Sequence, residues 1–188
     1  DERRTELLDE LGEFRVEDLI ADDNMVVTVS NLGYIKRLPV STYRKQRRGG
    51  RGVAGMETKE EDFVKDLFIA SAHQYMLFFT NRGRLYWRKV HELPKASRTA
   101  RGRAIVNVLE LAEGERVTAF LPVRDLNEEN RFVFMVTRMG TVKKTALKAF
   151  SNPRNVGIIA LDLDKGDELI EAQLTSGEDN ILIATHDG

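Results

Sequence analysis

The stretch MVVTVSNLGYIKR, residues 25–37, decides the predicted fold of this chain of 188 residues. An apolar, β-branched run leads into a short polar segment that ends in Gly33, and a second strand-like run follows it. β-branched and aromatic residues favour extended strands, and glycine favours the tight turns that join antiparallel strands. The stretch therefore predicts a β-hairpin.

The hairpin pattern recurs along the chain. Residues 76–88 and 132–144 repeat it, and residues 181–188 begin a fourth copy. The turn glycines Gly33, Gly83, Gly140 and Gly188 lie 50, 57 and 48 residues apart. Periods of this length are typical of propellers and solenoids, in which each unit packs against its neighbours.

Two further strands complete each unit. Gly52, Gly102 and Gly157 follow the turn glycines by 19, 19 and 17 residues, and each opens a short apolar stretch that predicts a strand. Alternating polar and apolar side chains, which are typical of half-buried strands, come next in each unit. These segments are residues 63–71, 116–123 and 168–174. About four strands per unit predict an all-β fold of propeller-like blades.

The repeat gives the expected organisation of the chain. Helix is predicted only near residues 3–11, where three leucines share one face, within an N-terminal segment at 1–13. The predicted units are blade 1 at 14–74, blade 2 at 75–129, blade 3 at 130–180 and the start of blade 4 at 181–188.

Charge is segregated along the sequence, although the net charge is only −1. Residues 24–56 hold seven basic side chains and no acidic one, residues 82–103 hold eight against Glu92, and residues 131–161 hold six against none. The acidic residues lie between these blocks. If the fold repeats in step with the sequence, positive charge gathers on one surface, as in proteins that bind nucleic acid.

Other chemistry has little support in the sequence. The chain has no cysteine, which excludes disulfides and thiol catalysis and favours a cytoplasmic protein. No apolar run reaches the roughly 20 residues of a membrane span, so no membrane partner is expected. His73, His91 and His186 are far apart in sequence, and no catalytic arrangement is recognisable. We expect no metal site, cofactor or catalytic residue in this chain.

The heptapeptide Gln46-Arg47-Arg48-Gly49-Gly50-Arg51-Gly52 carries the most specific functional signal. Its glycines let the backbone approach a partner closely, and its guanidinium groups fit phosphate oxygens as planar forks of donors. In this setting the heptapeptide resembles the gyrase-A box, the signature of the C-terminal DNA-wrapping domain of bacterial DNA gyrase A. The resemblance extends over the whole chain, and residues 1–6 look like the segment that leaves the breakage-reunion core.

The resemblance implies a particular fold and function. In that family six units form a pinwheel whose neighbouring blades exchange a strand, and this chain holds three units and the start of a fourth. The expected function is duplex DNA binding, bending and chiral wrapping that supports negative supercoiling. The implied partners are double-stranded DNA, the rest of a homodimeric gyrase A, and gyrase B in an A2B2 complex of the bacterial nucleoid. The strand-breaking tyrosine, Mg and ATP would then be used outside this chain.

Two alternatives remain at this stage. The related component of topoisomerase IV often has an incomplete wheel, but its box is degenerate, whereas this heptapeptide is intact. A propeller-like scaffold that binds protein or RNA belongs to a different class. Strong binding to duplex DNA without sequence preference would separate these hypotheses.

The predicted DNA contacts go to phosphates, because neither a recognition helix nor zinc-finger spacing is present. Besides the box at residues 46–52, they form a predicted basic rim. The rim residues are Lys36, Arg37, Arg44, Lys45, Arg84, Arg88, Lys89, Arg98, Arg101, Arg103, Arg138, Lys143, Lys144 and Arg154.

Overall fold

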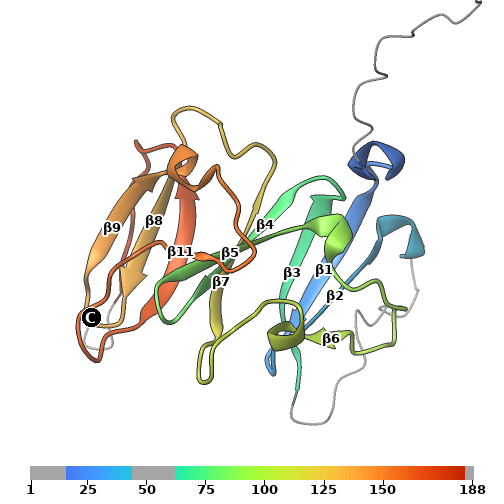
Figure 1. The fold of residues 1–188 in the computed structure, drawn as a ribbon, viewed down its shortest axis with the longest axis horizontal. Coiled ribbons are helices and arrows are strands. Elements are labelled where there is room, and N and C mark those ends of the chain that lie inside the picture. Colours follow the sequence, from blue (N-terminus) through green and yellow to red (C-terminus); the bar gives the residue numbers. More distant parts are fainter. Residues whose placement is uncertain (1–15, 44–61, 185–188) are drawn as a thin grey trace, which may run out of the picture.

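Three antiparallel sheets stand side by side in the computed structural model, which describes residues 16–43 and 62–184 (Figure 1). Sheet 1 has the order β3 (Val64–Ser71), β1 (Asn24–Ser30), β2 (Tyr34–Pro39) and β6 (Arg103–Ala104). Sheet 2 has the order β10 (Ile158–Ile159), β5 (Arg84–Lys89), β4 (Tyr75–Thr80) and β7 (Val117–Val123). Sheet 3 has the order β11 (Leu169–Thr175), β8 (Phe132–Thr137) and β9 (Val142–Ala146).

Short 3-10 helices lie between the strands in the described residues. They are η1 (Val16–Leu19), η2 (Val40–Thr42), η3 (Val90–Glu92), η4 (Ile105–Asn107) and η5 (Leu147–Phe150). In each unit the outgoing strand of the hairpin runs directly into one of these helices: β2 into η2, β5 into η3 and β9 into η5. The predicted helix near residues 3–11 lies outside the described residues.

Neighbouring units exchange a strand. β6 belongs to the second unit, but it pairs with Tyr34 and Ile35 of β2 in the first. In the same way β10, from the third unit, pairs with Arg84 and Leu85 of β5. The prediction of an all-β, propeller-like fold with strand exchange is therefore confirmed.

A fourth blade stays a prediction. Residues 181–184 carry no strand, and residues 185–188 lie outside the described part of the chain. The hairpins of the three sheets each pair their incoming strand with strands that come later in sequence, as β8 does with β9 and β11. Residues 181–184 have no such partner among the described residues, and the boundaries expected for the blades also stay predictions.

The apolar cores lie between the sheets rather than within them. Residues of β4 alternate between two cores: Met76 and Phe78 pack towards sheet 1, while Leu77 and Phe79 pack towards sheet 3. All four are fully buried, because sheet 2 has a neighbour on each side. This explains why β4 reads as a continuous apolar run, whereas β8 alternates buried and half-buried residues.

A hydroxyl supports the hairpin turn of every unit. Ser30, Thr80 and Thr137 accept a hydrogen bond from the backbone N–H four residues later, at 3.2, 3.3 and 3.0 Å. In the third unit the Asp167 carboxylate also accepts the Met139 N–H at 3.0 Å. Burial opposes ionisation of Asp167, but hydrogen bonds from Thr137 and two backbone amides outweigh it and lower its pKa.

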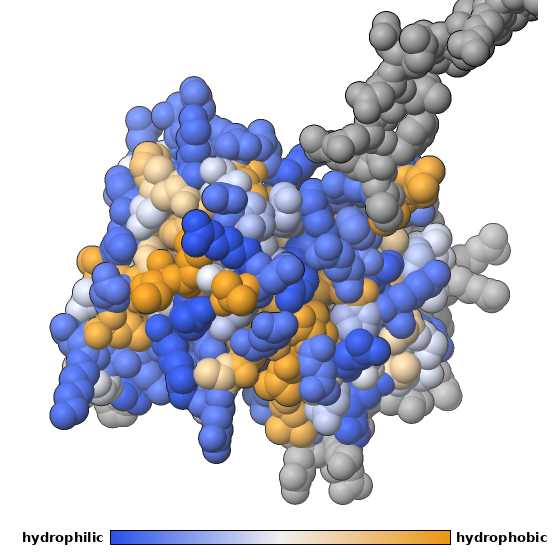
Figure 2. All heavy atoms as spheres, viewed as in Figure 1, coloured by the Kyte–Doolittle hydropathy of each residue, from blue (hydrophilic) through white to orange (hydrophobic). Residues whose placement is uncertain are grey.

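The surface combines polar side chains with apolar patches. Figure 2 shows hydrophobic areas on the face in view, interspersed among hydrophilic residues. Apolar side chains that are more than half exposed include Leu32, Leu67, Ile69, Val106 and Ile159. Among the described helices, none has the length and apolar character needed to cross a bilayer.

Candidate nucleic-acid interface

The predicted basic residues lie mostly on the outgoing strands of the hairpins and on the segments that lead to the exchanged strands. Arg84, Arg88 and Lys89 belong to β5, Lys143 and Lys144 to β9, and Arg103 to β6. These strands lie on the side of each sheet away from β3, β7 and β11, where β6 and β9 form the edge and β5 lies beside the short edge strand β10. The repeat therefore places cations on the same side of successive sheets.

The predicted rim residues differ in exposure. Six are exposed: Arg98, Arg103, Arg138, Lys143, Lys144 and Arg154. Five are half-buried: Arg37, Arg84, Arg88, Lys89 and Arg101. Lys36 is fully buried. Arg44, Lys45 and the box at 46–52 lie outside the described residues, so their role stays a prediction.

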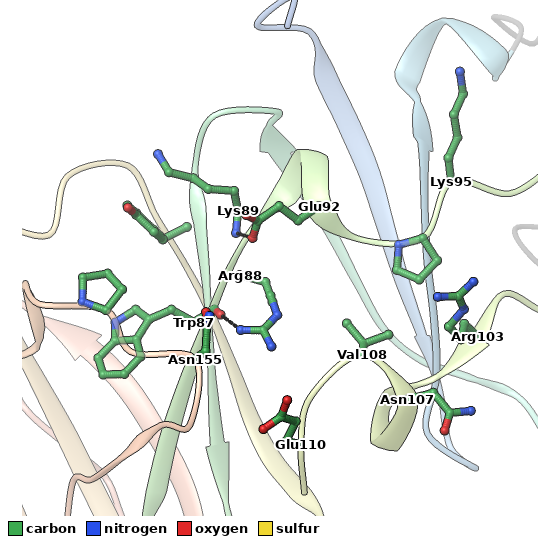
Figure 3. Close-up of a pocket in the computed structure, with 13 residues that line it drawn as sticks. Trp87, Arg88, Lys89, Glu92, Lys95, Arg103, Asn107, Val108, Glu110 and Asn155 are labelled. Atoms are coloured by element: carbon green, nitrogen blue, oxygen red, sulfur yellow. Dashed lines mark hydrogen bonds between the residues drawn. The ribbon is translucent and has the colours of Figure 1, made fainter. Parts of the chain in front are cut away.

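A groove of about 690 Å³ collects several of these cations at the second unit (Figure 3). Arg88 and Lys89 line it from β5, Lys95 from the segment after η3, and Arg103 from β6. Asn155, from the segment that precedes β10, also lines it, so residues of the second and third units contribute to one hollow. Figure 3 shows Arg88 in the groove with Glu110 on one side and Lys89 and Glu92 on the other.

Lys95 and Arg103 are the groove cations best placed to meet an anion. Both side chains are exposed, and neither makes a hydrogen bond or ion pair with another described residue. The Arg88 guanidinium donates one hydrogen bond, to the Trp87 carbonyl at 2.7 Å. Its other N–H donors can therefore bind an anion. Backbone phosphates are suitable partners, because guanidinium and ammonium groups bind their oxygens through charge-assisted hydrogen bonds.

Lys36 does not reach this surface. Its ammonium donates to the carbonyls of Ser97, Arg98 and Ala100 at 3.1, 2.6 and 2.8 Å. Burial lowers the pKa of Lys36, and these three acceptors compensate for lost water. We therefore leave Lys36 out of the proposed DNA contacts. Its three hydrogen bonds hold the first unit against the segment that leads into β6.

Replacement of Lys36 by methionine is expected to lower the free energy of unfolding by about 2 to 4 kcal/mol, because three carbonyl groups lose their donor. Lys144→Met is the matched control, since Lys144 is exposed and its ammonium lies 4.9 Å from the Phe132 ring centre. We expect the control to cost less than about 1 kcal/mol. Urea unfolding of both variants measures the difference, and equal costs would contradict the role given to Lys36.

Two other cations predicted to contact DNA already bind groups within the protein. Arg37 donates to the His91 and Leu93 carbonyls of the next unit at 2.6 and 2.9 Å, and burial lowers its pKa. Lys89 pairs with Glu17 at 2.9 Å and donates to the His73 carbonyl at 2.8 Å. These cations add positive potential at the surface, but a phosphate would have to compete for them.

Four more of the predicted cations also have partners within the protein. Arg84 donates to the Val156 carbonyl at 2.7 Å, and Lys143 to the Ala160 carbonyl at 3.2 Å. The Arg101 guanidinium lies 4.9 Å from the centre of the Tyr34 ring in the first unit. Arg138 donates to the Gly166 carbonyl at 2.9 Å and forms an ion pair with Glu168 at 3.6 Å.

Two aromatic residues of β5 are core residues. Tyr86 and Trp87 are 2% and 3% exposed, and Trp87 Nε1 donates to the Phe150 carbonyl of the third unit at 3.1 Å. Burial raises the pKa of Tyr86. Neither ring can stack on a nucleic-acid base without unfolding.

The sequence did not single out every residue of the candidate interface. Lys95, Asn107 and Asn155 line the groove, and of these only Lys95 had a signal, since it lies in the second basic block. His73 and His91, far apart in sequence, lie with ring centres 6.2 Å apart. The described residues nevertheless hold no group of three or more His, Cys, Asp or Glu that could bind a metal ion.

Comparison with known proteins gives a consistent result. The model of a family described as "DNA gyrase C-terminal domain, beta-propeller" matches residues 24–71, 74–124 and 131–176. The DNA gyrase A protein of Salmonella typhimurium is 54% identical over 183 residues, and that of Escherichia coli is 48% identical over 188. These matches cover 97% and 100% of the chain, which spans about a fifth (21%) of each relative's length.

Two solved structures share the fold. The C-terminal domain of a DNA topoisomerase IV superposes with a TM-score of 0.72 at 28% identity, covering 84% of this chain and 47% of that one. A DNA gyrase A C-terminal domain superposes with a TM-score of 0.61 at 22% identity, covering 81% of this chain and 48% of that one. The second likeness concerns the fold alone.

Proposed function

Because the chain belongs to the DNA gyrase C-terminal domain, beta-propeller family, we propose that it binds duplex DNA without sequence specificity and bends it into a chiral wrap. The observation that carries the proposal is the recurrence of exposed cations on the same side of successive sheets: Arg103 on β6, Lys144 on β9 and Arg154 in the segment before β10. A single such contact is weak. A periodic series can offset the free-energy cost of bending DNA, which is about 1 to 6 kcal/mol for 20 to 30 base pairs turned through 40 to 90°.

The wrap supports ATP-dependent negative supercoiling by the whole enzyme. The chain would present a distal DNA segment to the gate formed by the rest of gyrase A, while gyrase B hydrolyses ATP. This assigns the chain to an A2B2 complex at the bacterial nucleoid, in the cytoplasm. The curated relatives support the assignment, since both are DNA gyrase A proteins of bacteria.

The sequence relatives favour gyrase over topoisomerase IV. The fold match to topoisomerase IV does not separate the two enzymes, because both C-terminal domains superpose on this chain. The intact heptapeptide at residues 46–52 gives the box its full complement of three arginines. Topoisomerase IV, in contrast, is expected to carry a degenerate box.

The first experiment measures the change in linking number when the chain binds relaxed closed-circular DNA in the presence of topoisomerase I. We expect a positive shift at low salt that disappears at moderate salt, because phosphate neutralisation releases counterions. Tight binding with no shift would show that the chain contacts DNA without wrapping it. Absence of duplex binding at low salt would overturn the proposed function.

A variant with alanine at Arg88, Lys95 and Arg103 tests the groove. The log-log salt slope of DNA affinity is expected to fall by about 0.9 for each lost phosphate contact, hence by about 3. Alanine at three exposed cations elsewhere, Lys65, Arg124 and Lys165, is the charge-matched control. Equal losses in both variants would assign binding to overall charge rather than to the groove.

A further inference from the structure

The two seams between the three sheets are built from equivalent residues, so they can be compared directly. The first seam lies between sheets 1 and 2, and the second between sheets 2 and 3. Asn31 and Asn81 occupy the same turn position, since their amides donate to the carbonyls of Phe63 and Arg116 at 2.8 and 3.0 Å. By the same register, Arg116 corresponds to Glu168, whose carbonyl accepts the amide of Arg138 at 2.8 Å.

Both seams are fastened along the outgoing strand. In the first, Lys36 and Arg37 donate to five carbonyls of the second unit. In the second, Trp87 and Arg84 donate to the carbonyls of Phe150 and Val156 at 3.1 and 2.7 Å. An exchanged strand adds backbone pairing in both cases.

The hairpin turn of the second seam is also fastened. The amide of Leu169 donates to the Asn81 carbonyl at 3.0 Å, and the Asn81 side chain donates to Glu168 at 3.3 Å. Arg116 of the second unit adds an ion pair to the same Glu168 carboxylate at 2.8 Å. Asn81 is consequently only 5% exposed and Leu169 is fully buried.

The first seam lacks these turn contacts in the described part of the chain. Asn31 is exposed, and neither Arg116 nor Val117 makes a hydrogen bond to it. A groove of about 690 Å³ lies there instead, lined by Asn31, Leu32, Val106 and Val117 among others. Leu32 and Val106 are 55% and 57% exposed in it.

The surroundings of the turn glycines also differ between the two seams. At Gly83 an added Cβ would overlap the Leu161 carbonyl oxygen, and the amides of Ala160 and Leu161 both donate to the Gly83 carbonyl, at 2.8 and 3.1 Å. The Gly33 carbonyl accepts only one such hydrogen bond among the described residues, from the Ile105 amide at 2.8 Å. An added Cβ at Gly33 would meet no atom within 4 Å.

We propose that the first seam is a joint, at which sheet 1 tilts against sheet 2 about its outgoing strand and opens or closes the groove at the hairpin turn. The second seam moves as a rigid unit. Two packed sheets that are joined by hydrogen bonds along one strand but not at the hairpin turn can tilt against each other at a low cost in free energy. The consequence for DNA rests on the proposed function: tilting changes the angle between the first unit, which carries the box, and the second, and therefore the pitch of the wrap.

The test uses pairs of spin labels, which the chain accepts readily because it has no cysteine of its own. Leu32→Cys with Glu113→Cys spans the first seam, and Arg82→Cys with Lys165→Cys spans the second at equivalent exposed positions. We expect the distance distribution of the first pair to be about twice as wide as that of the second in the DNA-free chain, as for a joint beside a rigid seam. Addition of relaxed duplex DNA is expected to narrow the first distribution and leave the second unchanged.

Equally narrow distributions in the free chain would overturn the joint. If the first distribution stays wide on DNA whose binding is verified separately, tilting does not respond to the wrap, and that part of the proposal fails. The free-chain result is decided without DNA, so failure of the chain to bind DNA would count against the proposed function and not against the joint. A third pair within the second unit, Arg82→Cys with Glu113→Cys, checks that the labels themselves do not broaden the distribution.

Discussion

Alanine at Arg47, Arg48 and Arg51 together is expected to abolish negative supercoiling by the reconstituted gyrase and to leave relaxation of supercoiled DNA intact. The three guanidinium groups supply forked donors for phosphate within a glycine-rich segment. Without them, the first unit loses contacts that would offset the cost of bending. Relaxation does not need a chiral wrap, so strand passage continues. Supercoiling and relaxation assays on the full enzyme measure both activities.

A triple Arg→Lys variant separates charge from geometry. Lysine keeps the charge but cannot form the bidentate fork, so we expect intermediate supercoiling. Supercoiling at the wild-type rate in the triple alanine variant would contradict the role given to the box.

Of the variants proposed for this chain, Gly102→Ala is expected to lower the stability most. Gly102 has φ +93°, and an added Cβ would overlap the Ile35 carbonyl oxygen and lie 2.9 Å from Lys36 Cβ. Strain at positive φ and the overlap together should cost about 3 to 5 kcal/mol. The melting temperature should then fall by about 10 °C for a chain of this length.

Gly140→Ala is the control for Gly102→Ala. Gly140 has a similar φ of +87°, but an added Cβ would meet nothing within 4 Å. We therefore expect only the conformational cost of about 1 to 2 kcal/mol. Thermal unfolding of the two variants compares them, and equal melting temperatures would show that close approach to sheet 1 is unimportant at Gly102.

Much of the fold could be predicted because its signals are local. A hairpin is encoded within about a dozen residues, and the strands expected at 63–71, 116–123 and 168–174 are observed as β3, β7 and β11. The glycines at 102 and 157 could also be recognised, since each opens a short apolar stretch. The structure adds their physical reason, which is close approach to the sheet of the preceding unit.

The candidate site was harder to predict, and Lys36 shows why. Lys36 and Lys143 occupy equivalent positions on outgoing strands, yet the first is buried and the second exposed. The partners of Lys36 are three backbone carbonyls more than 60 residues away, and a carbonyl has no side-chain identity that a sequence pattern could reveal. Sequence therefore locates cations along a repeat, but it does not tell which of them face a neighbouring unit.

The exchanged strands also set the order in which the chain can fold during synthesis. Tyr34 and Ile35 cannot complete their pairing until Arg103 and Ala104 have left the ribosome. At typical elongation rates that delay is about 3 to 14 s, during which the edge of sheet 1 stays open. A similar interval recurs for β5, which waits for β10. Sheets 1 and 2 are thus each completed by a strand of the following unit. The nascent chain therefore completes these sheets in order from its N-terminus, each only after part of the next repeat has been synthesised.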